Sequence, residues 1–331
     1  MTVELHPSLS FGPRPILAPA KAMIVGEYAV LDGSPAVVAA IHCFASATLQ
    51  GEPGSPASPF ILAAQEQARA ALNARGIDVA QAGLDRLPLV DTSSFSRDGR
   101  KLGLGSSASA TVAAVGCWFA AAGLDIENAD IRRELAQVAR QAHDIAQGVR
   151  GSGADILAAT WGGLRIVGTT EADCPAPLAL PPGLCLRLVA TTESASTSVL
   201  VARYRAAGDA TQPARDQLAQ AARHFISACQ QSDAAQALQA VRNAYDGYVQ
   251  LGSAIGCPLA TDEHAAIAAA ARALGGAAKP SGAGGGDLAV ALLPTEDAAQ
   301  RLQGRLPSGL FVLPLQVSER GIHQASPAVA G

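Results

Sequence analysis

The stretch that says most about the fold is Gly103-Leu104-Gly105-Ser106-Ser107-Ala108, which leads into an alanine-rich apolar run. Its spacing, G-x-G-x-x-A, matches that of dinucleotide-binding loops, but such loops follow directly on a buried apolar strand. Here the preceding residues 96–101 are polar and turn-like. We therefore expect a loop that opens a helix at about residue 107, and hydride chemistry is disfavoured.

A loop of small residues in front of a helix is suited to binding an anion. Free backbone N–H groups and the positive end of the helix dipole meet there, and the missing side chains let phosphate oxygens approach. The hydroxyls of Ser106 and Ser107 add donors or a ligand for Mg²⁺, and Lys101 supplies a nearby positive charge. The alternative is a helix cap followed by close Ala and Gly packing. A Walker A loop is excluded, because it requires Gly-Lys and no lysine here follows a glycine.

Lysine is rare in this chain, and its positions are informative. The only lysines are Lys21, Lys101 and Lys279, against 21 arginines, and each lies at or beside a stretch rich in Gly, Ser or Ala. Lysine is a compact point charge on a slim stem, whereas arginine presents a planar fork. We therefore expect the three lysines at places where a point charge is needed.

Two further stretches carry glycines or polar groups of interest. Ser281-Gly282-Ala283-Gly284-Gly285-Gly286-Asp287 has four glycines in six consecutive residues and precedes a strand-like run, so it is expected to wrap a ligand or abut another glycine loop. Gly151-Ser152-Gly153-Ala154-Asp155 opens an apolar helix. The carboxylate of Asp155 could cap that helix, or with Lys21 it could orient or deprotonate a substrate hydroxyl.

These stretches, together with Ala18-Pro19-Ala20-Lys21 and Gly26-Glu27-Tyr28-Ala29-Val30-Leu31, resemble the motifs of the GHMP kinases, the family of galactokinase, homoserine, mevalonate and phosphomevalonate kinases. The motifs follow the family's order and spacing over about residues 15 to 320. The chain is most similar to the bacterial phosphomevalonate kinases, because Tyr28 stands where mevalonate kinases typically have histidine. Residues 91–95, 146–148 and 195–198 also resemble phosphomevalonate kinases.

Helices and strands without strict βαβ alternation predict an α+β fold. The resemblance implies a GHMP kinase-like fold of two domains, residues 1–180 and 181–331, with the active site in the cleft between them. It implies a phosphotransferase that uses ATP and Mg²⁺ to phosphorylate 5-phosphomevalonate, giving 5-diphosphomevalonate in the mevalonate pathway of isoprenoid synthesis. Two alternatives stay open: a kinase of mevalonate or another small metabolite, and a non-catalytic metabolite sensor, which would be expected to lose Lys21, Asp155 or a serine of the phosphate loop.

The resemblance assigns roles to individual residues. Lys21 and Asp155 would be catalytic, with Asp155 acting on the attacking oxygen and Lys21 holding that oxygen or the transferring phosphoryl group. ATP would be bound by Lys101, Gly103, Leu104, Gly105, Ser106, Ser107, Ala108, Gly282, Ala283, Gly284 and Gly285. The substrate would be bound by Lys21, Glu27, Tyr28, Ser152, Gly153, Asp155, Ser196, Thr197 and Ser281.

The metal ligands and the site for the substrate's own phosphate are less sharply defined. Ser107 and an acidic residue upstream of Asp155 would bind Mg²⁺; that position falls on His143 or Asp144, depending on a one-residue gap, and we expect Asp144. A further departure from the family is Ala20, where many relatives have glycine. The candidates for the substrate phosphate, each of which could equally be a solvated surface charge, are Arg100, Arg150, Arg203 and Arg205.

The composition limits the partners. With 331 residues, 49% of them hydrophobic, and a net charge of −4, the chain is globular and has no basic run that would bind nucleic acid or an anionic membrane. Its six cysteines lie far apart without a C-x-x-C pair, which argues against a zinc site and a disulfide scaffold. Residues 1–5 show no signal-peptide pattern, so we expect a cytoplasmic monomer or homodimer that acts on a small molecule.

Hydrophobic periodicity and turn residues predict the elements that carry these motifs. Strands are expected at 16–31, 36–44, 87–91, 163–168, 184–191, 287–293 and 310–317. Helices are expected at 60–75, 107–122, 126–145, 154–160, 195–206, 212–230, 233–252, 261–274 and 295–304. The uncharged residues 102–124 would form a polar loop and a buried helix rather than a membrane span. A glycine-rich loop is expected at 275–286 and a frayed tail at 324–331.

Overall fold

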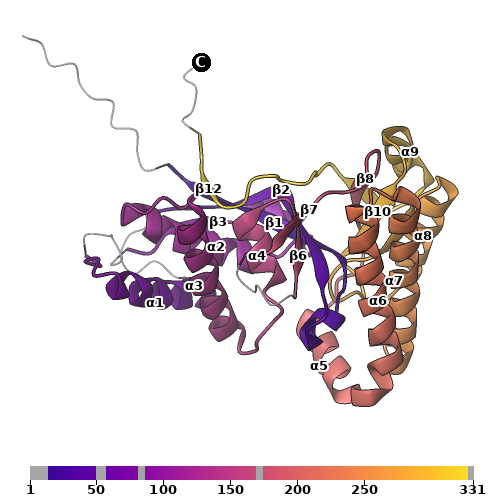
Figure 1. Ribbon diagram of the computed structural model, residues 1–331, viewed down its shortest axis with the longest axis horizontal. Helices are drawn as coiled ribbons and strands as arrows, with labels where there is room; N and C mark the ends of the chain where they lie inside the picture. Colours follow the sequence, from indigo (N-terminus) through magenta and orange to yellow (C-terminus); the bar gives the residue numbers. More distant parts are fainter. Residues whose placement is uncertain (1–13, 50–56, 81–85, 169–173, 327–331) are drawn as a thin grey trace, which may run out of the picture.

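The computed structural model describes residues 14–49, 57–80, 86–168 and 174–326 (Figure 1). Helices and antiparallel strands form two lobes that lie side by side, which confirms the predicted α+β fold class. The predictions for residues 1–5 and for the end of the tail at 327–331 lie outside the described residues.

The first lobe is built on an antiparallel sheet with strand order β12-β1-β2-β6-β7 and with β3 paired to β2. Its strands are Ile16–Val25 (β1), Ala36–Thr48 (β2), Leu89–Asp91 (β3), Leu164–Val167 (β6), Ala176–Leu178 (β7) and His323–Gln324 (β12). Strand β1 is buried on both faces, which explains why its sequence is a nearly continuous apolar run rather than an alternating one. Lys21 is the only charged residue in this strand.

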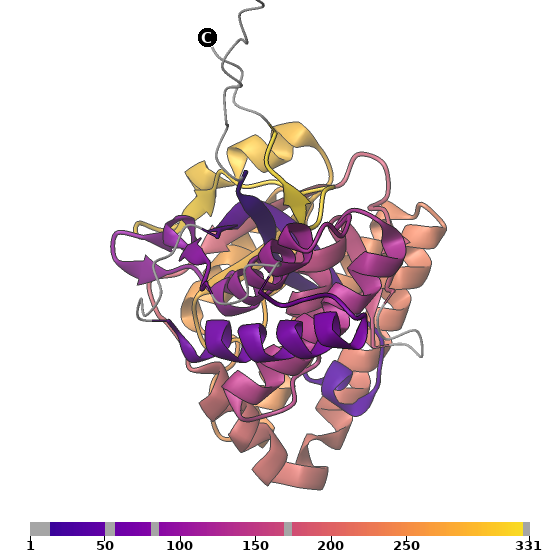
Figure 2. The same cartoon turned by 90° about the vertical axis from the view of Figure 1, so that its left-hand side faces the viewer.

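Four helices cover the first sheet: Pro59–Ala74 (α1), Ser106–Ala121 (α2), Ala129–Gln147 (α3) and Ala154–Trp161 (α4). Helices α2 and α4 pack on β1 and β2, while α1 and α3 pack on α2; α1 lies at the front in Figure 2. Trp118 and Phe119 of α2 are fully buried, so the uncharged run at 102–124 is a loop and a core helix, as predicted. No helix among the described residues has the length and apolar character that a membrane span needs.

The second lobe has an antiparallel sheet of four strands in the order β11-β8-β10-β9. The strands are Cys185–Ala190 (β8), Ala277–Pro280 (β9), Leu288–Leu293 (β10) and Phe311–Leu313 (β11). Its helices are Thr197–Ala207 (α5), Gln212–Gln230 (α6), Ala234–Ala254 (α7), Asp262–Ala273 (α8) and Glu296–Arg301 (α9). Helices α7 and α8 pack on β9, and α6 packs on α7. Helices α8 and α9 contact β10, every residue of which is buried.

The helix boundaries agree with the prediction within three residues, but several strands do not. The strand expected at 16–31 ends at Val25, because Gly26 (φ +92°) turns the chain so closely over Ala36 that a Cβ there would lie 2.6 Å from the Ala36 Cα. Part of the expected loop at 275–286 is strand β9, whose Ala277 and Ala278 are buried. The strand expected at 310–317 ends at Leu313.

Residues 316–324 return to the first lobe. The His42 N–H donates to Gln316 O (2.8 Å), the Ser318 N–H donates to Ala40 O (2.9 Å), and β12 pairs with β1. The beginning of the tail expected to fray is therefore part of a strand. The domain boundary at residue 180 remains a prediction, and residues 316–324 contact the first sheet rather than the second.

Gly321→Ala tests whether this return is tightly packed. A Cβ on Gly321 would lie 2.1 Å from Thr160 O and 2.6 Å from the Trp161 carbonyl carbon, at the end of α4. We expect this overpacking to lower the free energy of unfolding by about 1–3 kcal/mol, measured by urea denaturation. Gly304→Ala is the matched control, because a Cβ there meets nothing within 4 Å. Equal stability of the two variants would contradict the packing described.

Candidate active site

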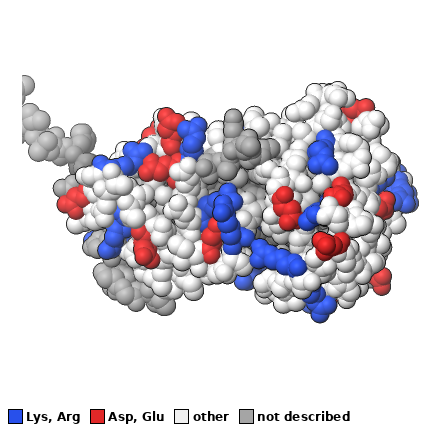
Figure 3. All heavy atoms as spheres, turned by 60° about the horizontal axis from the view of Figure 1, so that its bottom comes forward, with Lys and Arg blue, Asp and Glu red and all other residues white. Residues whose placement is uncertain are grey.

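A cavity of about 340 Å³ lies where the two lobes meet. The first lobe contributes the end of β1 with the turn after it, the last turns of α3 and the loop before α4. The second lobe contributes the start of α5 and the glycine-rich loop before β10. Figure 3 shows Lys and Arg side chains gathered beside a hollow between the lobes. A cavity between the lobes is where the sequence predicts the active site.

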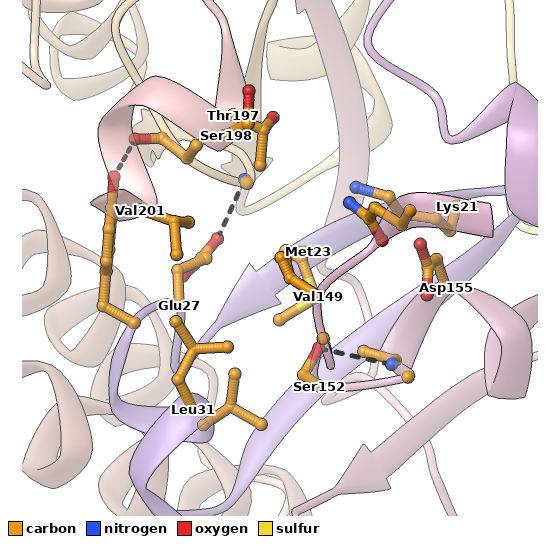
Figure 4. A pocket seen from close by; sticks show the side chains of 18 of the residues that line it. Lys21, Met23, Glu27, Leu31, Val149, Ser152, Asp155, Thr197, Ser198 and Val201 are labelled. Atoms are coloured by element: carbon orange, nitrogen blue, oxygen red, sulfur yellow. Dashed lines mark hydrogen bonds between the residues drawn. The ribbon is translucent and has the colours of Figure 1, made fainter. Parts of the chain in front are cut away.

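Lys21 and Asp155 both line one end of the cavity (Figure 4). The Lys21 backbone N–H donates to Leu104 O at 3.0 Å, which fixes this part of β1 beside the glycine loop. Asp155 is the second residue of α4, and its Oδ1 accepts the Ile156 N–H at 3.0 Å. Both side chains are half-buried. A cation and a carboxylate that converge on one space can hold and orient a reacting oxygen.

The loop at 103–105 lies against this end of the cavity. Gly103 and Gly105 have φ angles of +67° and +79°, which favour glycine. A Cβ on Gly105 would lie 3.0 Å from Lys21 Cγ, and a Cβ on Gly103 would lie 2.8 Å from Asp287 Cβ. Gly105 is also the N-cap of α2, so the first N–H groups of that helix lie next to Lys21. The geometry suits an anion, as the sequence predicts.

The glycine-rich loop of the second lobe is fastened to the end of β1. Ser281 Oγ accepts the Met23 N–H at 3.1 Å and donates to Met23 O at 3.0 Å. The Tyr28 hydroxyl donates to Ala283 O at 2.6 Å. Burial, followed by the charge of Glu27, raises the pKa of the Tyr28 phenol well above its usual value, which keeps the hydroxyl a donor.

A buried ion pair lies beneath the loop. Lys279 has no exposed surface, and its Nζ donates to Glu27 Oε1 at 2.5 Å and to Pro280 O at 2.7 Å. Burial lowers the pKa of Lys279, and the Glu27 carboxylate opposes that effect. The same Glu27 oxygen accepts the Gly282 N–H at 3.4 Å. The sequence predicts Glu27 as a substrate ligand but gives no sign of this pairing, which brings together residues 252 positions apart.

The residues expected to bind a metal lie along α3 and the start of α2. Asp144 lines the cavity, and its Oδ1 accepts the Gly151 N–H at 3.2 Å. Ser107 Oγ lies 3.2 Å from His143 Nε2, and the His143 ring is buried against Phe60. The described part of the chain contains no group of three or more His, Cys, Asp or Glu that could hold a metal unaided. Mg²⁺ commonly takes one or two protein oxygens together with waters and substrate phosphates, and Asp144, which faces the cavity, fits that mode. Ser107 lies at His143 and outside the lining.

Most of the residues predicted to bind the substrate line the cavity, namely Lys21, Glu27, Tyr28, Ser152, Gly153, Asp155, Thr197 and Ser281. Ser196 does not; it is exposed, and its hydroxyl lies 3.1 Å from that of Ser198, which does. Four of the residues predicted to bind ATP line the cavity: Gly103, Gly282, Ala283 and Gly284. Those outside the lining are Lys101, Leu104, Gly105, Ser106, Ser107, Ala108 and Gly285, and the Leu104 side chain is buried in the core.

Arg140 is a lining residue that the sequence analysis missed. Its guanidinium lies against the backbone of Gly153, where a Cβ would be 2.9 Å from Arg140 Cζ. Helical spacing contains the missing signal, because Arg140, His143, Asp144 and Gln147 follow one face of α3 and all line the cavity. Because the expected metal ligand Asp144 lies on this helix face, the sequence could have predicted that Arg140, four residues earlier, also lines the site.

Three arginines line the cavity, and two predicted candidates do not. Arg140, Arg150 and Arg205 are in the lining, and none of them forms an ion pair with a carboxylate of the described residues. Arg100 instead donates to Thr192 O at 2.7 Å, and Arg203 is an exposed residue of α5 outside the lining. An apolar part of the cavity, beside Glu27 and toward the Lys21 and Asp155 end, is formed by Met23, Leu31, Val149 and Val201 (Figure 4).

Comparison with known proteins gives the family. Residues 90–163 match the GHMP kinases N terminal domain, and residues 225–310 match the GHMP kinases C terminal domain. In an alignment 380 residues long, the chain is 32% identical to a protein of Streptomyces sp. (strain CL190) named phosphomevalonate kinase. The alignment covers 95% of this chain and 100% of that protein. The chain belongs to the GHMP kinase family.

Solved structures of GHMP kinases share the fold of this chain. Streptococcus pneumoniae phosphomevalonate kinase in complex with phosphomevalonate and AMPPNP has a TM-score of 0.78 at 20% identity, covering 92% of this chain and 99% of that one. L. major mevalonate kinase in complex with R-mevalonate has a TM-score of 0.64 at 22% identity, covering 98% and 100%. The fold predicted from the motifs is therefore confirmed, and the two relatives show that it accommodates both substrates.

Proposed function

We propose that this GHMP kinase transfers the γ-phosphoryl group of ATP to the phosphate of 5-phosphomevalonate, forming 5-diphosphomevalonate and ADP. The Streptomyces relative bears the name phosphomevalonate kinase, and the pneumococcal structure holds phosphomevalonate and AMPPNP. Within this chain, the observation that carries the proposal is the set of arginines around Lys21 and Asp155, none of which forms an ion pair with a carboxylate of the described residues.

The charge of the cavity favours an acceptor with a phosphate. Arg140, Arg150 and Arg205 line the same cavity as Lys21. A guanidinium binds phosphate or carboxylate through parallel N–H donors. Phosphomevalonate carries a phosphate and a carboxylate, whereas mevalonate carries only the carboxylate. Three arginines and a lysine match the more highly charged acceptor, and the apolar part of the cavity suits the carbon chain between its anionic ends.

The acceptor's chemistry defines what Lys21 and Asp155 would do. The attacking oxygen belongs to a phosphate monoester, whose second pKa is about 6, so near neutral pH it is already ionised and needs no general base. Lys21 would neutralise charge on this oxygen and on the transferring phosphoryl group, which is the main form of catalysis in phosphoryl transfer. Asp155 lines the same end of the cavity as Lys21 and would help to orient the attacking oxygen.

The nucleotide phosphates would lie between the two glycine loops. The N-terminus of α2 would supply backbone N–H groups, and the glycines from Gly282 to Gly286 would allow close approach. Mg²⁺ held by Asp144 would supply positive charge to the nucleotide phosphates. Lys101, exposed before α2, would reach the ATP or the substrate phosphate.

An ADP-release assay with MgATP tests the proposal directly by comparing phosphomevalonate with mevalonate. We expect the wild-type protein to turn over phosphomevalonate. Lys21→Met and Asp155→Asn should each lose on the order of 10²–10³ in kcat, because each removes a group that orients or neutralises the transferring phosphoryl. Turnover of mevalonate alone, or nucleotide binding without turnover of either compound, would overturn the assignment.

Arg140→Gln tests the cation that the sequence analysis missed. A charge-assisted hydrogen bond contributes about 1.5–3 kcal/mol, so we expect kcat/KM for phosphomevalonate to fall roughly 10- to 100-fold. Arg203→Gln is the matched control, because Arg203 is exposed and lies outside the cavity. If the two variants had the same kcat/KM, Arg140 would have no part in binding the acceptor.

Gly105→Ala tests the close approach of the phosphate loop to Lys21. The added Cβ would lie 3.0 Å from Lys21 Cγ and should displace the side chain, with a loss of kcat of about 10-fold or more. Gly99→Ala is a control with a similar φ, +76° against +79°, and it meets nothing within 4 Å. Both variants carry the same backbone strain, so only a difference between their kcat values reports on Lys21.

A further inference from the structure

The buried pair Lys279–Glu27 joins the two lobes directly beneath the site. Lys279 is on β9 of the second lobe, and Glu27 is in the turn that follows β1 of the first. Neither side chain is exposed to an appreciable extent, at 0% and 3%. The Lys279 ammonium also lies 5.1 Å from the ring centroid of Tyr248. The ammonium is therefore held from three sides, by a carboxylate, a carbonyl and an aromatic face.

Stability alone does not account for this pair. Desolvation of two charges offsets most of their attraction, and replacing a buried pair with apolar residues of similar volume is often neutral or stabilising. Glu27 Oε2 is in addition buried without a hydrogen-bond partner among the described residues. The role of the pair is better judged from the backbone groups that it holds in place in the second lobe.

The pair and its neighbours fix three consecutive residues of the second lobe. Lys279 Nζ donates to Pro280 O, Ser281 Oγ bonds to both backbone groups of Met23, and Glu27 Oε1 accepts the Gly282 N–H. Gly282 is adjacent to the reacting end, because a Cβ on it would lie 3.9 Å from Lys21 Nζ. The segment from Pro280 to Gly282 therefore connects the buried pair to the lysine expected to neutralise the phosphoryl group.

The turn that carries Glu27 is also strained. Tyr28 has a φ of +61°, which is costly for a residue with a side chain, and it is held by its bond to Ala283 O in the glycine-rich loop. The two lobes thus stabilise each other. The glycine-rich loop holds the turn through the Tyr28 hydroxyl, and Glu27 in the turn holds the loop through the Gly282 N–H.

We propose that Glu27 and Lys279 are positioning residues that set the glycine-rich loop, and through Gly282 the ammonium of Lys21, at the transferring phosphoryl group. The proposal rests on the proposed kinase function and adds a role for two residues that need not touch the substrate. It differs from the sequence prediction for Glu27, in which the carboxylate binds the substrate itself.

The double variant E27L/K279M separates positioning from stability. It replaces the pair with apolar side chains of similar size, so we expect it to melt close to the wild type, whereas E27L and K279M alone should be strongly destabilised. Misplacement of the loop should lower kcat on the order of 10²-fold in the double variant, with much less change in the KM for phosphomevalonate. The control E127Q/R320M removes an exposed ion pair between distant segments and should keep the wild-type kcat.

Two results would overturn the proposal. A double variant that folds and keeps the wild-type kcat would make the pair dispensable for the site. A rise in the KM for phosphomevalonate at unchanged kcat, in E27L/K279M and in the milder Glu27→Asp, would show that Glu27 binds the substrate directly. Glu27→Asp also covers the case in which the double variant does not fold. This variant retains the negative charge beside Lys279, but its shorter side chain reaches less far toward the Gly282 N–H. A positioning role therefore predicts a lower kcat, whereas a purely structural role of the charge predicts an unchanged kcat.

Turnover of phosphomevalonate by the wild type, measured in the same series, distinguishes a failure of the positioning role from a failure of the proposed function. If the wild type does not use phosphomevalonate, the proposed function fails, and the affinity for MgAMPPNP, measured by calorimetry, still tests the positioning of the loop. We expect the folded double variant to bind MgAMPPNP more weakly, by about 10-fold, because several loop contacts shift together. Unchanged binding would overturn the positioning role.

Discussion

The functional site depends on the hydrogen bonds that fasten the glycine-rich loop to strand β1. Strand β12 covers the outer edge of β1 only at residues 16 and 17, so the backbone of Met23 is free to bond with Ser281. This contact draws the second lobe over the end of β1 and places the loop beside Lys21. The two glycine loops belong to different lobes, and this contact holds them beside the same cavity. The buried pair of Glu27 and Lys279 and the bond from Tyr28 to Ala283 strengthen the same junction.

Much of the site could be predicted because its chemistry is local. Small residues before an apolar helix predict an anion-binding loop, whereas the neighbours of Asp155 predict only a carboxylate at a helix start, and its catalytic role came from the family resemblance. The parts that were missed depend on tertiary structure. Lys279 is conspicuous as one of three lysines, but only the folded chain shows that it is buried against Glu27. Strand β9 was not predicted, because its short run of Ala, Ala, Lys and Pro has low intrinsic strand propensity and adjoins a glycine-rich stretch.

The arginines illustrate a second limit of sequence reasoning. In α3 and α5, an arginine that faces a cavity and one that faces solvent have the same local sequence character, so Arg205 and Arg203 could not be told apart. Fold similarity does not decide the substrate either, since a phosphomevalonate kinase and a mevalonate kinase both share this fold, with TM-scores of 0.78 and 0.64. We propose that the number of cations that face the acceptor distinguishes the substrates, and that number depends on the side chains of the cavity.

A structure of this protein with phosphomevalonate and MgAMPPNP is the most direct test of the account. We predict that the substrate phosphate lies between Lys21 and the γ-phosphate, with the Arg140 guanidinium in contact with it and the nucleotide phosphates on the N-terminus of α2. The carbon chain should lie along Met23 and Val201. A substrate phosphate bound away from Lys21 and Arg140, or a nucleotide bound away from both glycine loops, would contradict the central claim that the cations of this cavity select a phosphorylated acceptor.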